Sequence, residues 1–196
     1  GPGQMALDEA FLESATLPTL RVYHWDAPAV SFGFSQSLAA VRGLHPHLPL
    51  VRRWTGGGIV EHTGDWTFSL IVPTGEPLAA LRPTETYRRI HEALRVVLEQ
   101  LGLGTRLVQA DDCRTGAACF TAPALHDIHN ARGDKLCGGA QRRTRRGFLH
   151  QGSIQQVAVP EDFEWKVAGA FASEITTSVV APFLTKRAEF LSREKY

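Results

Sequence analysis

The most informative stretch of the chain reads Arg52-Arg53-Trp54-Thr55-Gly56-Gly57-Gly58-Ile59-Val60-Glu61-His62, and the apolar run Thr67-Phe68-Ser69-Leu70-Ile71-Val72 follows it. Three consecutive glycines remove every Cβ from a short piece of backbone, which can then adopt positive φ angles and let a ligand lie against the main chain. The arginines offer forked donors for a carboxylate or a phosphate, and a histidine can titrate near neutral pH. The stretch therefore predicts one wall of a small-molecule site between strands.

Length and composition are those of one globular domain, residues 1–196. Of the 196 residues 43% are apolar, and 21 Lys and Arg against 20 Asp and Glu give a formal charge of +1. This near-zero net charge predicts no general electrostatic attraction to nucleic acid or to a membrane. Since no apolar run approaches the roughly 20 residues of a membrane helix and no export leader is recognisable, we expect a cytoplasmic protein.

The cysteines support the same compartment. Cys113, Cys119 and Cys137 are odd in number and form no CxxC pair. This spacing argues against a disulfide framework or a structural zinc site, and for a reducing environment. Cys137 is expected in the core, and Cys113 in a loop without a role.

Hydrophobic periodicity predicts more strands than helices. The clearest helix covers residues 84–101, between Pro83 and Gly102, and further helices are expected at residues 5–14 and after Pro160. Strands are expected over residues 20–25, 29–34, 48–53, 59–72, 105–109, 125–129, 135–141 and 148–155. Tight turns join two strand pairs, so the predicted class is α+β with a mixed, largely antiparallel sheet flanked by helices.

A second unusual stretch reads Gly133-Asp134-Lys135-Leu136-Cys137-Gly138-Gly139-Ala140-Gln141. Its first residues suit a hairpin turn. Two glycines inside a strand weaken it unless something must approach closely, and a lysine supplies a compact positive charge for a carboxylate, a phosphate or an oxyanion. The residues alone therefore predict an α+β domain with an anion- or acyl-binding cleft.

Four ordered segments resemble the lipoate/octanoate and biotin protein ligase superfamily, over nearly the whole chain. Residues 4–10 resemble its opening helix, and residues 23–36 its first hairpin with the glutamine that follows. Residues 52–62 are similar to its RRxTGGGxVxH signature, and residues 133–141 to its GxKxxGxAQ signature. The resemblance implies an α+β domain that binds octanoate or lipoate in a tunnel. It also implies transfer of that acyl group to the lysine of a lipoyl carrier domain, on the glycine-cleavage H protein or a dehydrogenase E2.

Two branches of this superfamily differ in chemistry. Octanoyltransferases move octanoyl from acyl carrier protein onto a cysteine, without a cofactor, and Cys119-Phe120-Thr121-Ala122-Pro123 resembles their nucleophile region. Ligases use ATP and Mg²⁺ to form an acyl-adenylate. Asp65 stands where ligases typically have asparagine, and the separate C-terminal domain of many ligases is absent. Both points favour the transferase.

The resemblance assigns the site as follows. Cys119 and Lys135 are the catalytic residues, because a cationic lysine lowers the pKa of a nearby thiol. The acyl chain is expected along the glycine wall and the face that carries Phe32 and Val60. No metal is expected, and the substrate-binding set is Arg53, Gly56, Gly57, Gly58, His62, Gly138, Gly139 and Ala140.

Some positions depart from the family or leave alternatives open. Gln151 precedes Gly152 where the family has histidine, which leaves His150 without an assigned role, and Asp127 matches an acidic family position. The basic run at residues 142–146 is expected as a solvated hairpin tip or a docking patch for an acidic carrier. The alternatives to the transferase are an ATP-dependent lipoate–protein ligase and a non-catalytic acyl- or carrier-binding module.

Overall fold

The structure, a computed structural model, describes residues 1–110 and 124–195. Its larger sheet has six strands in the order β1-β5-β9-β8-β7-β6, and every neighbouring pair is antiparallel. The strands of this sheet are β1 (Thr19–Tyr23), β5 (Trp66–Pro73), β6 (Thr105–Leu107), β7 (Ile128–Asn130), β8 (Lys135–Thr144) and β9 (Gly147–Ile154).

A smaller sheet has three strands in the order β3-β2-β4. In it β2 (Ala29–Phe32) pairs in parallel with β3 (Leu50–Arg52) and antiparallel with β4 (Ile59–His62). The predicted α+β class with mixed, largely antiparallel pairing is confirmed.

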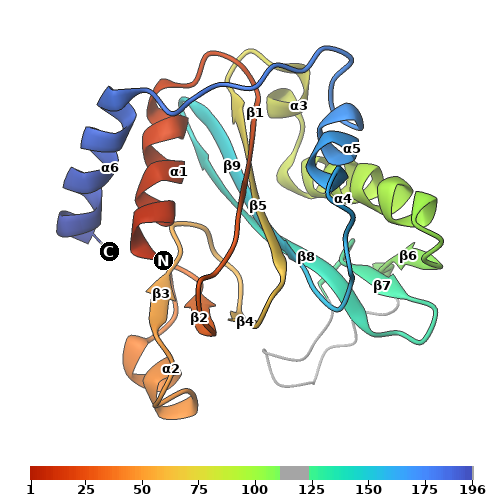
Figure 1. Ribbon diagram of the computed structural model, residues 1–196, viewed down its shortest axis with the longest axis horizontal. Coiled ribbons are helices and arrows are strands. Elements are labelled where there is room, and N and C mark those ends of the chain that lie inside the picture. The colour runs from red at the N-terminus through yellow and green to blue at the C-terminus, as the bar shows by residue number, and fades with distance from the viewer. Residues whose placement is uncertain (111–123, 196) are drawn as a thin grey trace.

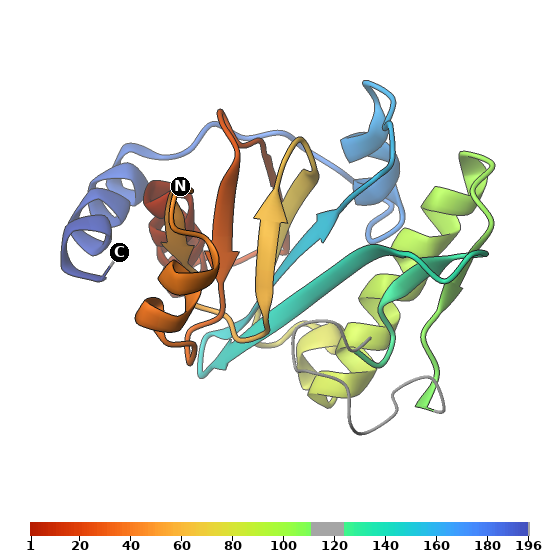
Figure 2. The ribbon, with the colours of Figure 1, turned by 90° about the horizontal axis from the view of Figure 1, so that it is seen from below.

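Helices cover both faces of the large sheet (Figures 1 and 2). One face packs against α4 (Pro83–Gln100), α3 (Pro77–Ala80) and α5 (Phe163–Gly169), and the other against α1 (Pro2–Ser14), which α6 (Pro182–Lys195) covers in turn. Phe68 and Phe148 belong to the core beside α4, whereas Ile71 and Leu149 pack with Leu12 of α1. Both faces of β5 and β9 are therefore buried, which explains why their sequences are apolar without alternation.

The small sheet lies at the end of α1, together with the short helix α2 (Leu38–Leu44) (Figure 1). Val30, Phe32 and Val41 form its core. Just after β2, a Cβ at Gly33 would collide with the carbonyl oxygen of Gly57. Only glycine at this position lets the glycine loop pack directly on the small sheet.

Three details of the sequence prediction were wrong. The first hairpin does not form, because β1 pairs with β5 while β2 lies in the other sheet. The expected strand over residues 59–72 is broken at Gly64, whose φ is +109°, so that β4 and β5 belong to different sheets. The helices α2 and α3 were not predicted, because each spans too few residues to show a helical period: α2 buries only Val41, and α3 buries none of its residues.

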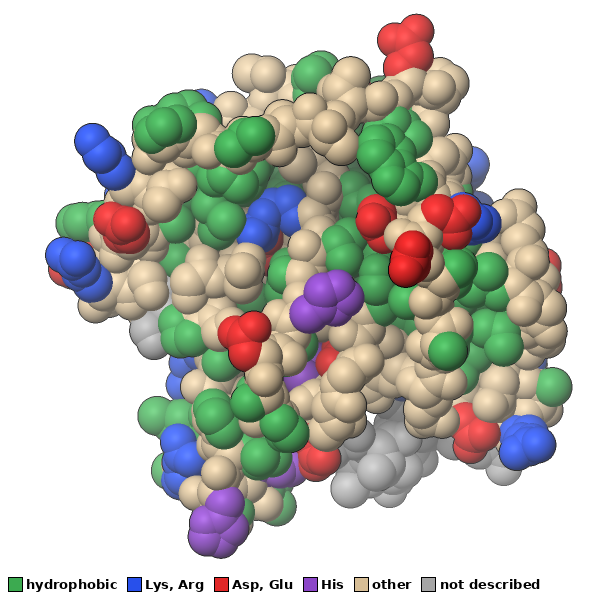
Figure 3. All heavy atoms as spheres, viewed as in Figure 1, with side chains coloured by type: hydrophobic (Ala, Val, Ile, Leu, Met, Phe, Trp, Pro, Cys, Tyr) green, Lys and Arg blue, Asp and Glu red, His purple; other side chains and the backbone are tan. Residues whose placement is uncertain are grey.

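On the face shown in Figure 3, basic and acidic side chains both occur among apolar and neutral ones, and several acidic side chains lie close together at the upper right. Among the described residues, no helix combines the length and the apolar character needed to cross a membrane.

Candidate active site

A cavity of about 500 Å³ lies where the two sheets meet. This is within the range typical of small-molecule sites, about 300–1,000 Å³. Its walls come from the glycine loop and β4 on one side and from β8 and β9 on the other. Of the predicted site residues it is lined by Arg53, Gly57, Gly58, His62, Lys135, Gly138, Gly139 and Ala140.

Arg53 organises the glycine loop from within. Its buried guanidinium donates to Ser31 Oγ (2.8 Å) and to the carbonyl oxygens of Gly56 (3.0 Å) and Gly58 (2.7 Å). Burial lowers its pKa to about 10, so the group stays charged at neutral pH. The forked donors that the sequence suggested for a ligand are thus directed at the protein's own loop.

Within the triplet, Gly57 is the residue that the backbone requires. Its φ is +84°, and a Cβ there would lie 3.2 Å from the Arg53 guanidinium and 3.3 Å from the Ala140 side chain. Gly56 and Gly58 have open space where a Cβ would stand. The loop therefore approaches β8 most closely at Gly57.

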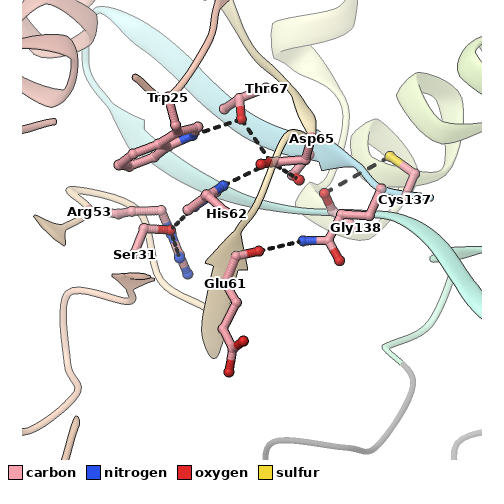
Figure 4. Close-up of polar contacts among 11 residues, drawn as sticks. Trp25, Ser31, Arg53, Glu61, His62, Asp65, Thr67, Cys137 and Gly138 are labelled. Atoms are coloured by element: carbon pink, nitrogen blue, oxygen red, sulfur yellow. Dashed lines mark hydrogen bonds and ion pairs between the residues drawn. The ribbon is translucent and has the colours of Figure 1, made fainter. Parts of the chain in front are cut away.

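His62 is held between two sheets (Figure 4). Its Nε2 lies 2.7 Å from Ser31 Oγ, its Nδ1 lies 2.8 Å from Asp65 Oδ2, and its ring stacks on Trp25 at 4.0 Å. Burial alone would raise the pKa of Asp65, but hydrogen bonds from His62, Ser153 and Thr67 outweigh burial and hold the pKa below its usual value. Asp65 is therefore a carboxylate at neutral pH.

The opposite wall carries a lysine with a buried counter-ion. Lys135 Nζ lies 2.8 Å from Asp127 Oδ2, and the lysine side chain is 51% exposed whereas that of Asp127 is 1% exposed. Tyr87 donates its hydroxyl to Asp127 Oδ1 (2.7 Å), and the Ala124 amide donates to Oδ2 (2.9 Å). These contacts fix the carboxylate, while the ammonium remains accessible from the cavity.

The two glycines of β8 make room for the protein's own side chains. A Cβ at Gly138 would lie 2.5 Å from Lys135 Nζ, and a Cβ at Gly139 would lie 2.5 Å from His150 Nε2. The lysine thus folds back over Gly138, next to the cavity. The close approach predicted from the sequence exists, but the approaching groups belong to the chain itself.

Several expected positions lie elsewhere. Val60 lines the cavity, whereas Phe32 packs in the core of the small sheet. Cys137 is buried in the main core as predicted, and burial raises the pKa of its thiol. Cys113 and Cys119 lie outside the described residues.

The basic run at residues 142–146 is divided. Arg142 lies over the rings of Phe34 and Trp54, and Arg143 donates to Ala79 O and to the hydroxyl of Thr86. Both arginines belong to β8, so a uniformly solvated tip is not what the structure shows.

Gln151 is a cavity residue that sequence reasoning treated only as a departure from the family. It donates to Asp8 Oδ2 (2.7 Å) and accepts from Thr55 Oγ1 (2.7 Å), so it ties the glycine loop to α1. His150 points to the other side of the sheet, against His91 of α4. Side chains alternate between the two faces of a strand, so the sequence of β9 could have predicted that Gln151 and His150 point to opposite faces of the sheet.

Among residues 1–110 and 124–195, no group of three or more His, Cys, Asp or Glu side chains is placed to hold a metal ion. The structure is thus an α+β domain with a cavity between two sheets, walled by glycine backbone and a lysine–aspartate pair and of the size of a small-molecule site. The chain belongs to the lipoyl protein ligase A/B catalytic domain family, whose profile matches residues 2–194.

Individual relatives agree with this assignment. The chain is 38% identical to octanoyltransferase LipM of Moorella thermoacetica over 164 residues, which cover 76% of this chain and 59% of that protein. It therefore spans less than two thirds of the length of the curated relatives that it matches.

Solved structures share the fold. A bipartite lipoate protein ligase with its E2 lipoyl domain from Thermoplasma acidophilum has a TM-score of 0.78 and 19% identity, over 99% of this chain and 88% of that one. A lipoate-protein ligase A bound with ATP has a TM-score of 0.76 and 21% identity, over 99% and 90%.

Proposed function

We infer that this chain is an acyltransferase that passes an octanoyl or lipoyl group to the lysine of a lipoyl carrier domain, with the acyl group held in between as a thioester on Cys119. Lys135 and the cavity beside it carry the inference. The ammonium lies accessible at the wall, over glycine backbone, where a thioester carbonyl can be polarised as its oxygen gains charge. The curated relatives bear the name octanoyltransferase, which supports the same chemistry.

The charges of the cavity favour a thioester over a nucleotide. Arg53 is engaged with its own loop, and Lys135 is paired with Asp127. Among the residues that the structure describes, the charged ones that line the cavity are two cations and two carboxylates, Arg53 and Lys135 against Glu61 and Asp127. A triphosphate needs an excess of positive charge, whereas a neutral acyl thioester does not.

Cofactor and partners follow from this chemistry. A thioester is already activated toward an amine, so the proposed reaction needs neither ATP nor Mg²⁺. The proposed donor is an octanoyl acyl carrier protein, and the proposed acceptor is the lipoyl domain of a glycine-cleavage H protein or a dehydrogenase E2. Residues 1–196 would act as one catalytic unit, in a cytoplasmic setting.

Intact mass spectrometry after incubation with octanoyl carrier protein, without ATP, tests the proposal. We expect a gain of one octanoyl group on the wild-type chain and none on Cys119→Ser. Cys137→Ser is the matched control and should load like the wild type, since the Cys137 thiol is buried and its pKa is raised. If Cys119→Ser gains the octanoyl group as the wild type does, the proposed thioester on Cys119 is wrong.

The two alternatives give different readouts. Release of pyrophosphate from ATP that depends on lipoate, with no adduct from the carrier protein, would replace the transferase with a lipoate–protein ligase. Carrier binding with neither signal would leave a non-catalytic binding module.

A further inference from the structure

Four buried polar side chains form a line from the glycine loop to the large sheet. Arg53 donates to Ser31 Oγ (2.8 Å), Ser31 Oγ lies 2.7 Å from His62 Nε2, and His62 Nδ1 lies 2.8 Å from Asp65 Oδ2. Figure 4 shows these residues side by side. Each of the four is at most 7% exposed.

One arrangement of protons along this line suits a relay. A guanidinium only donates, so Ser31 Oγ accepts from Arg53, and a carboxylate only accepts, so Asp65 receives the Nδ1–H of His62. When Ser31 donates its own proton to Nε2, serine, imidazole and carboxylate stand in the order of a general-base relay.

The line lies close to the reactive wall. Ser31 and His62 both line the cavity. Asp65 accepts from Ser153, and Ser153 pairs in register with Gly138, over which the ammonium of Lys135 lies. Trp25 stacks on the imidazole and donates to Thr67, so the ring cannot turn away.

We propose that Ser31, His62 and Asp65 form a proton relay that removes the proton of the acceptor amine during acyl transfer. The relay rests on the proposed function, because it serves the second half of that reaction.

The step balances as follows. The amine nitrogen attacks the thioester carbonyl carbon and a C–N bond forms, while the C–S bond breaks and its electron pair leaves on sulfur. The surplus amine proton passes to Ser31 Oγ as the proton of Ser31 passes to His62 Nε2. Asp65 balances the imidazolium, and the proton returns by the same path to the thiolate, which leaves an amide and a thiol.

The competing explanation for these hydrogen bonds is a purely structural role, since the same contacts join the two sheets. The charged groups that face His62 are Asp65 and, behind Ser31, Arg53; Trp25, from the loop between β1 and β2, is neutral. Loss of a purely structural contact would slow both half-reactions by the same factor and leave the pH dependence of their rates unchanged. Loss of a relay would affect only the step that releases a proton.

The test separates the two half-reactions by single-turnover intact mass. Wild type, His62→Gln and Asp65→Asn are loaded with octanoyl carrier protein, and transfer to a lipoyl domain is then followed from about pH 6 to about pH 9. For Asp65→Asn we expect loading within about twofold of wild type, and for both variants transfer about 10²-fold slower with a flattened pH profile of transfer. His24→Gln, an exposed histidine after β1, is the matched control and should behave like wild type.

Equal slowing of loading and transfer, or a transfer profile unchanged in His62→Gln, would overturn the relay alone. A wild-type chain that never loads would overturn the proposed function, and the relay with it. If His62→Gln does not fold, Asp65→Asn carries the same test, because it keeps the shape of the side chain.

Discussion

The two walls of the cavity hold their cations in opposite ways. On the glycine wall, Arg53 is buried and hydrogen-bonded to its own loop, and the exposed charge of that wall is the carboxylate of Glu61 on β4. On the β8 wall, Lys135 is half exposed and only its partner Asp127 is buried. A buried charge that is fully engaged can shape a site but has little freedom to follow a substrate, whereas an exposed ammonium can turn toward one.

We propose that the glycine wall supplies shape and the β8 wall supplies reactivity. The loop carbonyls bound by Arg53 set the position of Gly57 against Ala140. The ammonium of Lys135 is half exposed and can approach a carbonyl oxygen. Three measurements test this division of roles.

The largest effect is expected from Lys135→Ala. Loss of the ammonium should slow acyl transfer about 10²–10³-fold, as for the removal of one oxyanion donor. The urea midpoint should also fall, because Asp127 stays buried without its counter-ion, so rates are compared at a temperature where the variant is fully folded. Lys166→Ala on α5, which removes another partly exposed and ion-paired lysine, is the control. Full transfer activity in Lys135→Ala would show that the residues needed for the reaction lie on the glycine wall instead.

Acid should weaken the β8 wall through the histidines behind it. Burial lowers the pKa of His91 to about 3 and that of His150 well below 6.5. Both are neutral when folded but take up a proton when unfolded below pH 6.5, so stability falls as the pH drops below that value. Denaturant titration at about pH 5.5 should show a loss of about 1 kcal/mol for His91. His91→Phe should reduce this pH dependence, and an unchanged slope would contradict the assignment.

The smallest effect separates the glycines of the triplet. Gly57→Ala places a Cβ at φ +84° and should lower the free energy of unfolding by about 1 kcal/mol. Gly58→Ala has open space and should change it by no more than a few tenths of a kcal/mol. Equal losses in thermal or chemical unfolding would show that the loop is shaped by something other than backbone conformation.

The sequence predicted much of the fold. The long helix is expected at residues 84–101 and observed as α4, and most strands lie within a few residues of their expected bounds. The prediction was wrong where strand pairing decided the structure. It joined β1 and β2 in one hairpin, although they lie in different sheets. Local pattern reports that a segment is extended, but pairing is decided by contacts between residues far apart in the chain.

For the site, the sequence predicted both glycine segments and Lys135, which contribute to the cavity lining, because glycines and charges inside apolar strands are unusual by themselves. It predicted that Arg53 contacts the ligand, and it predicted no role for Ser31 or Gln151. Arginine looks the same in sequence whether its donors face a substrate or a carbonyl of its own loop, and a serine in a strand carries no mark of its neighbours. The direction of each donor is a property of packing, so only the tertiary structure decided that the Arg53 cation is enclosed and that the Lys135 cation is accessible.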